Sequence, residues 1–99
     1  MSQVKFKAVT ESGPVEVMGG WDRPLSEFYM TIFDLATDAE DETVWASMFG
    51  PSPKTTAPLR AQLVQMGIEA PEEFWDRVER REANVTHVYA DGKWTRDEF

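Results

Sequence analysis

The sequence contains no cysteine and only one histidine, His87, among its 99 residues. Without cysteine the chain forms neither a disulfide bond nor a thiolate nucleophile, and zinc sites that use cysteine are excluded. A single histidine also leaves no pair of histidines at a metal-binding spacing. We therefore expect no metal and no cofactor, and we regard enzymatic activity as the less favoured class of function.

Basic residues and long apolar runs are scarce as well. Ten Lys and Arg residues stand against 18 Asp and Glu, so the formal net charge is −8. Binding to duplex nucleic acid relies on neutralising phosphates, so direct nucleic-acid binding is not expected. An acidic surface instead favours a basic protein partner. No apolar run reaches membrane-spanning length and the N-terminus lacks an apolar signal segment, so we expect a cytoplasmic protein without membrane contact.

The composition is otherwise that of one folded domain. Hydrophobic residues make up 41% of the chain, including four tryptophans and six phenylalanines. This content is ordinary for a globular protein and argues against disorder. A chain of this length builds one modest core, so we assign residues 1–99 to a single domain.

Residues 27–35 form the stretch around which we expect the fold to be organised. In an extended chain successive side chains point to opposite faces, and here both faces are mostly apolar, with aromatic and β-branched residues on each. The stretch therefore predicts a central strand that is covered on both sides, with Phe33 in the core.

The remaining elements are predicted from local patterns. Alternating apolar residues indicate strands at 4–9, 15–18, 43–49 and 86–90, and Asp91-Gly92 is typical of a two-residue hairpin turn. Helical spacing indicates one helix from Thr56 to Gly67 and a second from Pro71 to Asn84. We predict an α+β fold: an antiparallel sheet of four N-terminal strands plus a C-terminal strand or hairpin, with two helices packed on one face.

Residues 19–25 are predicted to form a bend before the central strand. Two glycines allow positive φ, and Pro24 restricts the backbone. In the structural interpretation Trp21 is the apolar plug of this corner. In the functional interpretation Trp21, Asp22 and Arg23 form a recognition loop, because Trp and Arg dominate binding hot spots.

The segment Gly20-Trp21-Asp22-Arg23-Pro24-Leu25 before an aromatic strand, with a later Gly67-Ile68-Glu69-Ala70-Pro71, resembles a group of short, uncharacterised bacterial proteins. The resemblance covers roughly half of the chain. It implies a bacterial source and a single-domain protein, and it brings no activity with it.

Residues 37–43 contain the acidic run, with carboxylates at Asp38, Glu40, Asp41 and Glu42. A calcium loop is disfavoured because the central glycine and the distal bidentate glutamate of that motif are missing. We predict an exposed loop between two strands that serves as a binding surface for a basic protein.

Three functions remain open. The favoured one is a small, acidic, non-catalytic protein-binding or regulatory module that uses Trp21, Asp22, Arg23 and the acidic run. One alternative is a small enzyme or ligand-binding protein with a pocket near Trp21, Arg23 and His87. The other is an acidic mimic of nucleic acid that inhibits a nucleic-acid-binding protein.

Self-association is also expected. A short sheet leaves an unpaired edge, which is a template for a second copy of the chain. Trp94 lies close to the end of the chain, where a large side chain has least chance of burial against its own fold. We therefore predict a homodimer with Trp94 at or near the contact.

Overall fold

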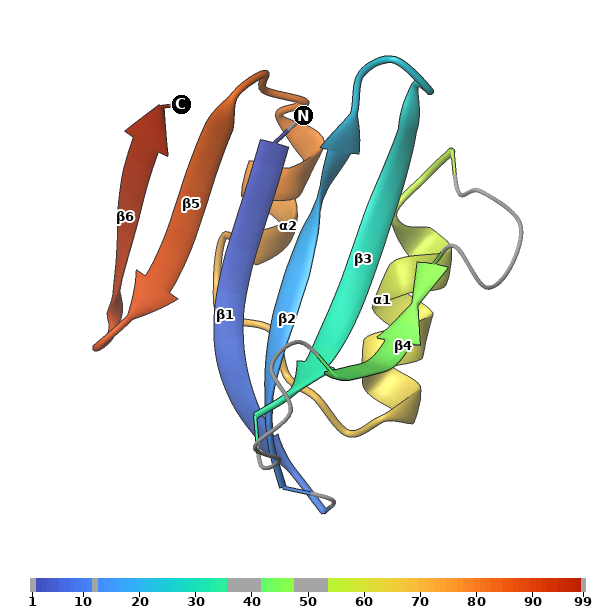
Figure 1. Cartoon of the computed structure of the whole chain (residues 1–99), viewed down its shortest axis with the longest axis vertical. Helices are drawn as coiled ribbons and strands as arrows, with labels where there is room; N and C mark the ends of the chain where they lie inside the picture. Colours follow the sequence, from blue (N-terminus) through green and yellow to red (C-terminus); the bar gives the residue numbers. More distant parts are fainter. Residues whose placement is uncertain (1, 12, 36–41, 48–53, 99) are drawn as a thin grey trace.

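The computed structural model describes residues 2–11, 13–35, 42–47 and 54–98, without the side chain of Glu42 (Figure 1). The predicted binding residues Asp38, Glu40 and Asp41 lie outside the described residues. The described elements are β1 (Ser2–Thr10), β2 (Gly13–Asp22), β3 (Glu27–Asp34), β4 (Glu42–Ala46), α1 (Ala57–Gln65), α2 (Phe74–Glu79), β5 (Val85–Ala90) and β6 (Lys93–Glu98). Neither helix in these ranges is long and apolar enough to cross a membrane.

One six-stranded sheet has the order β4-β3-β2-β1-β5-β6, and both helices lie on the same face of it (Figure 1). The α+β class and the two helices on one face are confirmed. The prediction of an antiparallel sheet is wrong in one place, because β5 pairs with β1 in parallel, with Ser2 opposite Val85. The two helices connect β4 to β5 and carry the chain across the sheet to the free side of β1, where β5 runs in the same direction as β1.

The core lies between the helices and the sheet. Phe74 of α2 is fully buried, and its ring packs edge-on against Phe6 with centroids 4.8 Å apart. Gly19 leaves the space for the Phe74 ring, since a Cβ there would lie 3.1 Å from it. Helix α1 ends as predicted: Gly67 has φ +71°, and the N–H of buried Ile68 donates to the carbonyl of Leu63 over 2.9 Å.

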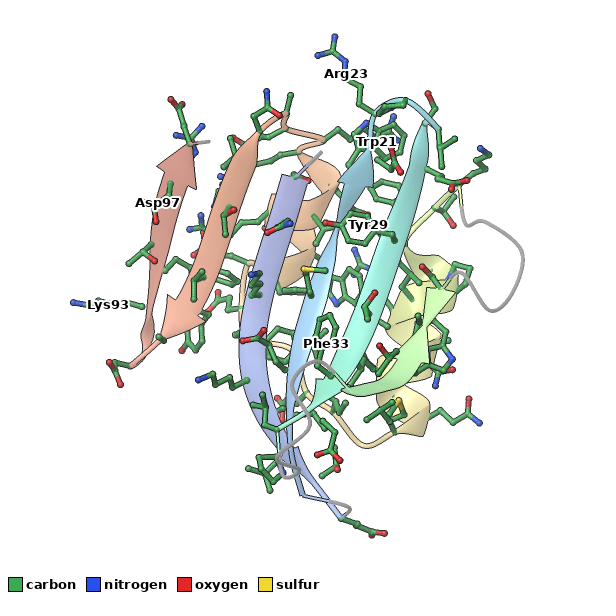
Figure 2. All side chains as sticks on the ribbon, in the orientation of Figure 1. Trp21, Arg23, Tyr29, Phe33, Lys93 and Asp97 are labelled. Atoms are coloured by element: carbon green, nitrogen blue, oxygen red, sulfur yellow. The ribbon has the colours of Figure 1, made fainter. Side chains whose placement is uncertain are left out.

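Strand β3 is confirmed, but it is neither central nor covered on both faces. Its even-numbered side chains Phe28, Met30 and Ile32 are buried under the helices. Tyr29 and Phe33 are half-buried on the other face, which carries neither helix (Figure 2). The prediction that Phe33 is a core residue is therefore wrong, and its neighbour Ile32 is the core residue.

The prediction of a bend at Gly19 and Gly20 is wrong, because both glycines are part of extended β2. A Cβ at Gly20 would collide with the backbone carbonyl of Ser2 and lie 2.9 Å from the Tyr29 ring. The pair is therefore required for close packing, and the chain turns only after Asp22.

Helix α2 is shorter than predicted: it begins at Phe74, after a residue with positive φ, and ends at Glu79.

Candidate functional site

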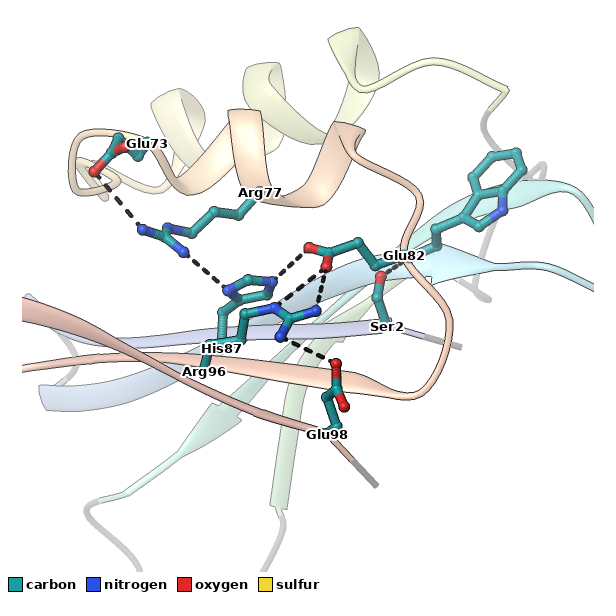
Figure 3. A network of polar contacts seen from close by, with 8 residues as sticks. Ser2, Glu73, Arg77, Glu82, His87, Arg96 and Glu98 are labelled. Atoms are coloured by element: carbon teal, nitrogen blue, oxygen red, sulfur yellow. Dashed lines mark hydrogen bonds and ion pairs between the residues drawn. The ribbon is translucent and has the colours of Figure 1, made fainter.

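His87 lies at the centre of a chain of polar side chains between the sheet and α2 (Figure 3). Alternation along β5 directs this side chain beneath the helix, where it has no exposed surface. Its Nδ1 is 2.9 Å from Nη1 of Arg77, and its Nε2 is 2.7 Å from Oε1 of Glu82. Both ring nitrogens therefore have a partner from a different segment of the chain.

The partners of His87 determine its tautomer. A guanidinium group can only donate, so Nδ1 accepts a hydrogen bond from Arg77 and carries no proton. The proton of the neutral imidazole is then on Nε2, which donates to the carboxylate of Glu82. Such an arrangement orients the ring and leaves neither nitrogen free to act on a ligand.

Glu82 continues the chain of contacts to the edge of the sheet. Its Oε2 accepts a hydrogen bond of 3.0 Å from Nη2 of Arg96, whose Nη1 is 3.2 Å from Oε1 of Glu98. Burial raises the pKa of Glu82, but the hydrogen bonds from His87 and Arg96, together with the charge of Arg96, outweigh this effect, so its pKa is lowered. The network thus joins an ionised carboxylate to α2, β5 and β6.

Trp21 is a buried corner residue rather than part of an open loop. Its side chain is only 9% exposed, and its ring packs against Phe28 and beneath the guanidinium of Arg81, 4.6 Å from the ring centroid. The backbone N–H of Trp21 donates to Oγ of Ser2 over 3.0 Å. Arg23 is exposed and points away from the sheet at the tip of the β2–β3 turn (Figure 2).

Tyr29 is a second polar residue of this corner that the sequence did not single out. Its hydroxyl donates to the carbonyl of Ser2, beside Gly20. Burial, and then the negative charge of Asp22, raise the pKa of the Tyr29 hydroxyl, so it stays protonated at neutral pH. The corner therefore ties β1, β2 and β3 together.

Among the described binding residues, Asp22 and Arg23 lie at the start of β3, whereas Glu42 pairs with Asp34 at its end. Trp21, Arg23 and His87 do not converge on a pocket among the described cavities. His87 is closed to solvent, and the described cavities are lined by other residues.

Trp94 is half-buried against its own chain, so the physical reason for expecting its ring at a dimer contact is wrong. Its indole Nε1 donates to the backbone carbonyl of Glu72 over 3.1 Å. Its ring is 5.2 Å from that of Tyr89, and the guanidinium of Arg77 lies over it at 4.7 Å. The ring is one of the contacts that hold β6 to α2.

A hollow of about 570 Å³ lies where β1, β4 and α1 approach one another at one end of the sheet. Val9, Val44 and Val64 line it and are 79%, 48% and 78% exposed. The described lining also includes the carboxylates of Glu11 and Asp34 and no basic residue. We call these five residues the valine hollow. Exposed apolar side chains that gather around one concavity mark interaction sites more often than scattered ones do.

The sequence contained a signal for the valine hollow that periodicity alone did not reveal. Val9 stands on the face of β1 that carries Lys5 and Lys7, and Val64 follows Leu63 outside the buried stripe of α1. Both are apolar residues at positions where the alternation of the strand and the periodicity of the helix predict polar residues. In the described part of the chain no cluster of His, Asp and Glu is suited to hold a metal ion.

Comparison with known proteins finds no match to a family model, to a curated protein or to a solved structure. The resemblance around residues 20–25 to short bacterial proteins therefore stays a prediction.

Proposed function

We propose that the chain is a small, non-catalytic protein-binding module whose contact surface is the valine hollow. The observation that carries the proposal is the convergence of Val9, Val44 and Val64 from three separate elements on one concave site. A partner that fills the hollow removes three exposed valine side chains from water. Since their exposed fractions add up to about two full side chains, at roughly 1.5 kcal/mol for each full side chain this contributes about 3 kcal/mol before the costs of association.

The charge around the valine hollow defines the chemistry of the partner. Glu11 and Asp34 are in its lining, and the whole chain has a net charge of −8. The acidic run connects the end of β3 to the start of β4, and Asp34 of β3 and Val44 of β4 both line the hollow. We therefore propose a partner segment that presents apolar side chains flanked by Lys or Arg, with the predicted acidic run adding to the attraction.

Site-specific photocrosslinking tests this function. A photoreactive amino acid at Val64 or at Val44 is expected to transfer to the same protein in a lysate of the source organism. The crosslinked peptide should contain basic and apolar residues. Capture should weaken as salt is raised, because the Debye length is only about 8 Å at physiological ionic strength. The matched control carries the photoreactive group at Thr86, which lies opposite Gln3 at the end of β1 far from Val9 and is not in the lining of the hollow.

Three outcomes would reject the valine hollow as the binding site: equal capture from Thr86, an acidic crosslinked peptide, or transfer only to a second copy of the chain. Glu11→Gln should weaken capture without lowering the melting temperature, since Glu11 is exposed. If the captured protein binds nucleic acid and DNA releases it, the chain is the nucleic-acid mimic among the three hypotheses.

A further inference from the structure

Strand β6 offers a regular free edge. In the described part of the chain the sheet ends in β4 on one side and in β6 on the other. The pairing of β4 is irregular where it passes Ile32 and Phe33, whereas β6 pairs with β5 over its whole length. A regular edge presents unpaired backbone N–H and C=O groups to another strand.

The turn between β5 and β6 determines which backbone groups face this edge. Asp91 and Gly92 have φ of 54° and 78°, as in the two-residue type I′ turn. The residues that flank such a turn form a hydrogen-bonded pair, so Lys93 directs its backbone groups toward β5. Because this direction alternates along a strand, the backbone groups of Trp94 and Arg96 point outward.

We propose that β6 pairs with β6 of a second copy of the chain, antiparallel and centred on Thr95. A twofold axis perpendicular to the sheet relates the two strands, so opposite residues must have side chains on the same face. In this register Trp94 and Arg96 of the two copies form the hydrogen-bonded pairs. The outward backbone groups are thus satisfied, and the two sheets become continuous.

The charges of β6 select this register. Lys93 and Asp97 lie on the face of β6 that carries neither helix (Figure 2). In this register each Lys93 lies opposite Asp97 of the second copy, and each Trp94 lies opposite an Arg96. A shift of two residues in one direction places Arg96 against Arg96, and a shift in the other places Lys93 against Thr95. Neither of these two registers pairs opposite charges, so of the three only the Thr95-centred one is electrostatically self-complementary.

The two charges that bridge the copies are available for this contact. Within the described residues neither Lys93 nor Asp97 forms an ion pair with its own chain. A contact along one strand is small, so we expect weak association in the micromolar range that salt weakens further. This surface is separate from the valine hollow, so either proposal can fail without the other.

Charge reversal tests the register by sedimentation at micromolar to millimolar concentration. Lys93→Asp and Asp97→Lys each place like charges opposite one another, and each should weaken self-association by about tenfold or more. An equimolar mixture of the two variants should associate again, because an aspartate of one copy then meets a lysine of the other at both ends of the contact. Lys7→Asp changes the net charge as Lys93→Asp does but lies on β1, so it should behave as the wild type does.

Cysteine substitution gives an independent test, since the chain has no cysteine of its own. At a non-hydrogen-bonded antiparallel pair the Cα atoms are about 4.5 Å apart, which a disulfide can bridge. Thr95→Cys should therefore form a covalent dimer on mild oxidation, and Lys93→Cys should not, because its counterpart lies about four residues away along the strand. A monomeric wild type at all concentrations, a mixture that fails to associate, or equal crosslinking of both cysteine variants would overturn the proposal.

Discussion

Replacing Glu82 with glutamine tests whether the network of polar side chains around His87 holds β5 and β6 against α2. The substitution keeps the size of the side chain but removes the negative charge that His87 and Arg96 share. A hydrogen bond with a charged partner contributes about 1.5–3 kcal/mol, whereas a neutral one contributes about 0.5–1.5 kcal/mol. The partly exposed Arg96 pair adds about 0.5 kcal/mol. We therefore expect Glu82→Gln to lower the free energy of unfolding by about 1.5–2 kcal/mol at pH 7.

The effect must depend on pH in a defined direction. The pKa of Glu82 is lowered from its ordinary value of 4.5, because the ionised form has more favourable contacts in the folded state. Its contribution is therefore fully present above 4.5 and is lost as the pH falls through the lower folded-state pKa. The difference in stability between the wild type and Glu82→Gln should be constant near neutrality and should shrink only below 4.5.

Urea unfolding followed by tryptophan fluorescence measures both quantities. Glu98→Gln is the matched control, since Glu98 also pairs with Arg96 but its side chain is 73% exposed. An exposed pair of this kind contributes about 0.5 kcal/mol or less. If Glu82→Gln is as stable as the wild type, or if both variants lose the same stability, the buried network does not stabilise the fold in the way described.

Three further predictions concern single residues. The nitrogen NMR spectrum of His87, the sole histidine, should show a protonated Nε2 and an unprotonated Nδ1 at neutral pH; the opposite tautomer would contradict the assigned hydrogen bonds. Ile32→Ala should cost about 2–5 kcal/mol in urea unfolding, because Ile32 is fully buried, whereas Phe33→Ala should cost about 1–2 kcal/mol. Equal losses would show that both faces of β3 are covered. Gly20→Ala should cost about 2 kcal/mol or more, since the added Cβ meets the Ser2 backbone, and an unchanged melting temperature would refute this packing.

Local signals predicted most of the elements. The Asp91-Gly92 turn and the end of α1 at Gly67 depend on backbone conformations that neighbouring residues determine, and both are confirmed. The parallel pairing of β1 with β5 was not predicted, because no local pattern identifies a partner strand at the other end of the chain. The glycines in β2 were misinterpreted for a related reason: their role depends on Phe74 and Tyr29, which pack over them.

The polar network could be predicted only in part. The sequence identified His87 as the sole histidine and placed it in the strand predicted at 86–90. Its partners Arg77, Glu82 and Arg96 come from a helix, a connection and a strand, so their meeting depends on how those elements pack. Arg77 reaches His87 because its side chain, only 15% exposed, turns from α2 toward β5.

The parallel pairing of β1 and β5 also determines the order in which the chain can fold. Strands β1 to β4 form a meander of sequence neighbours, whereas β1 acquires its second partner only when residues near Val85 arrive. Contacts between such distant residues carry a large loop-closure cost and slow the folding of a domain. During synthesis the edge of β1 is therefore open until the C-terminal hairpin docks, and Lys5 and Lys7 on that strand oppose its pairing with other nascent chains in the meantime.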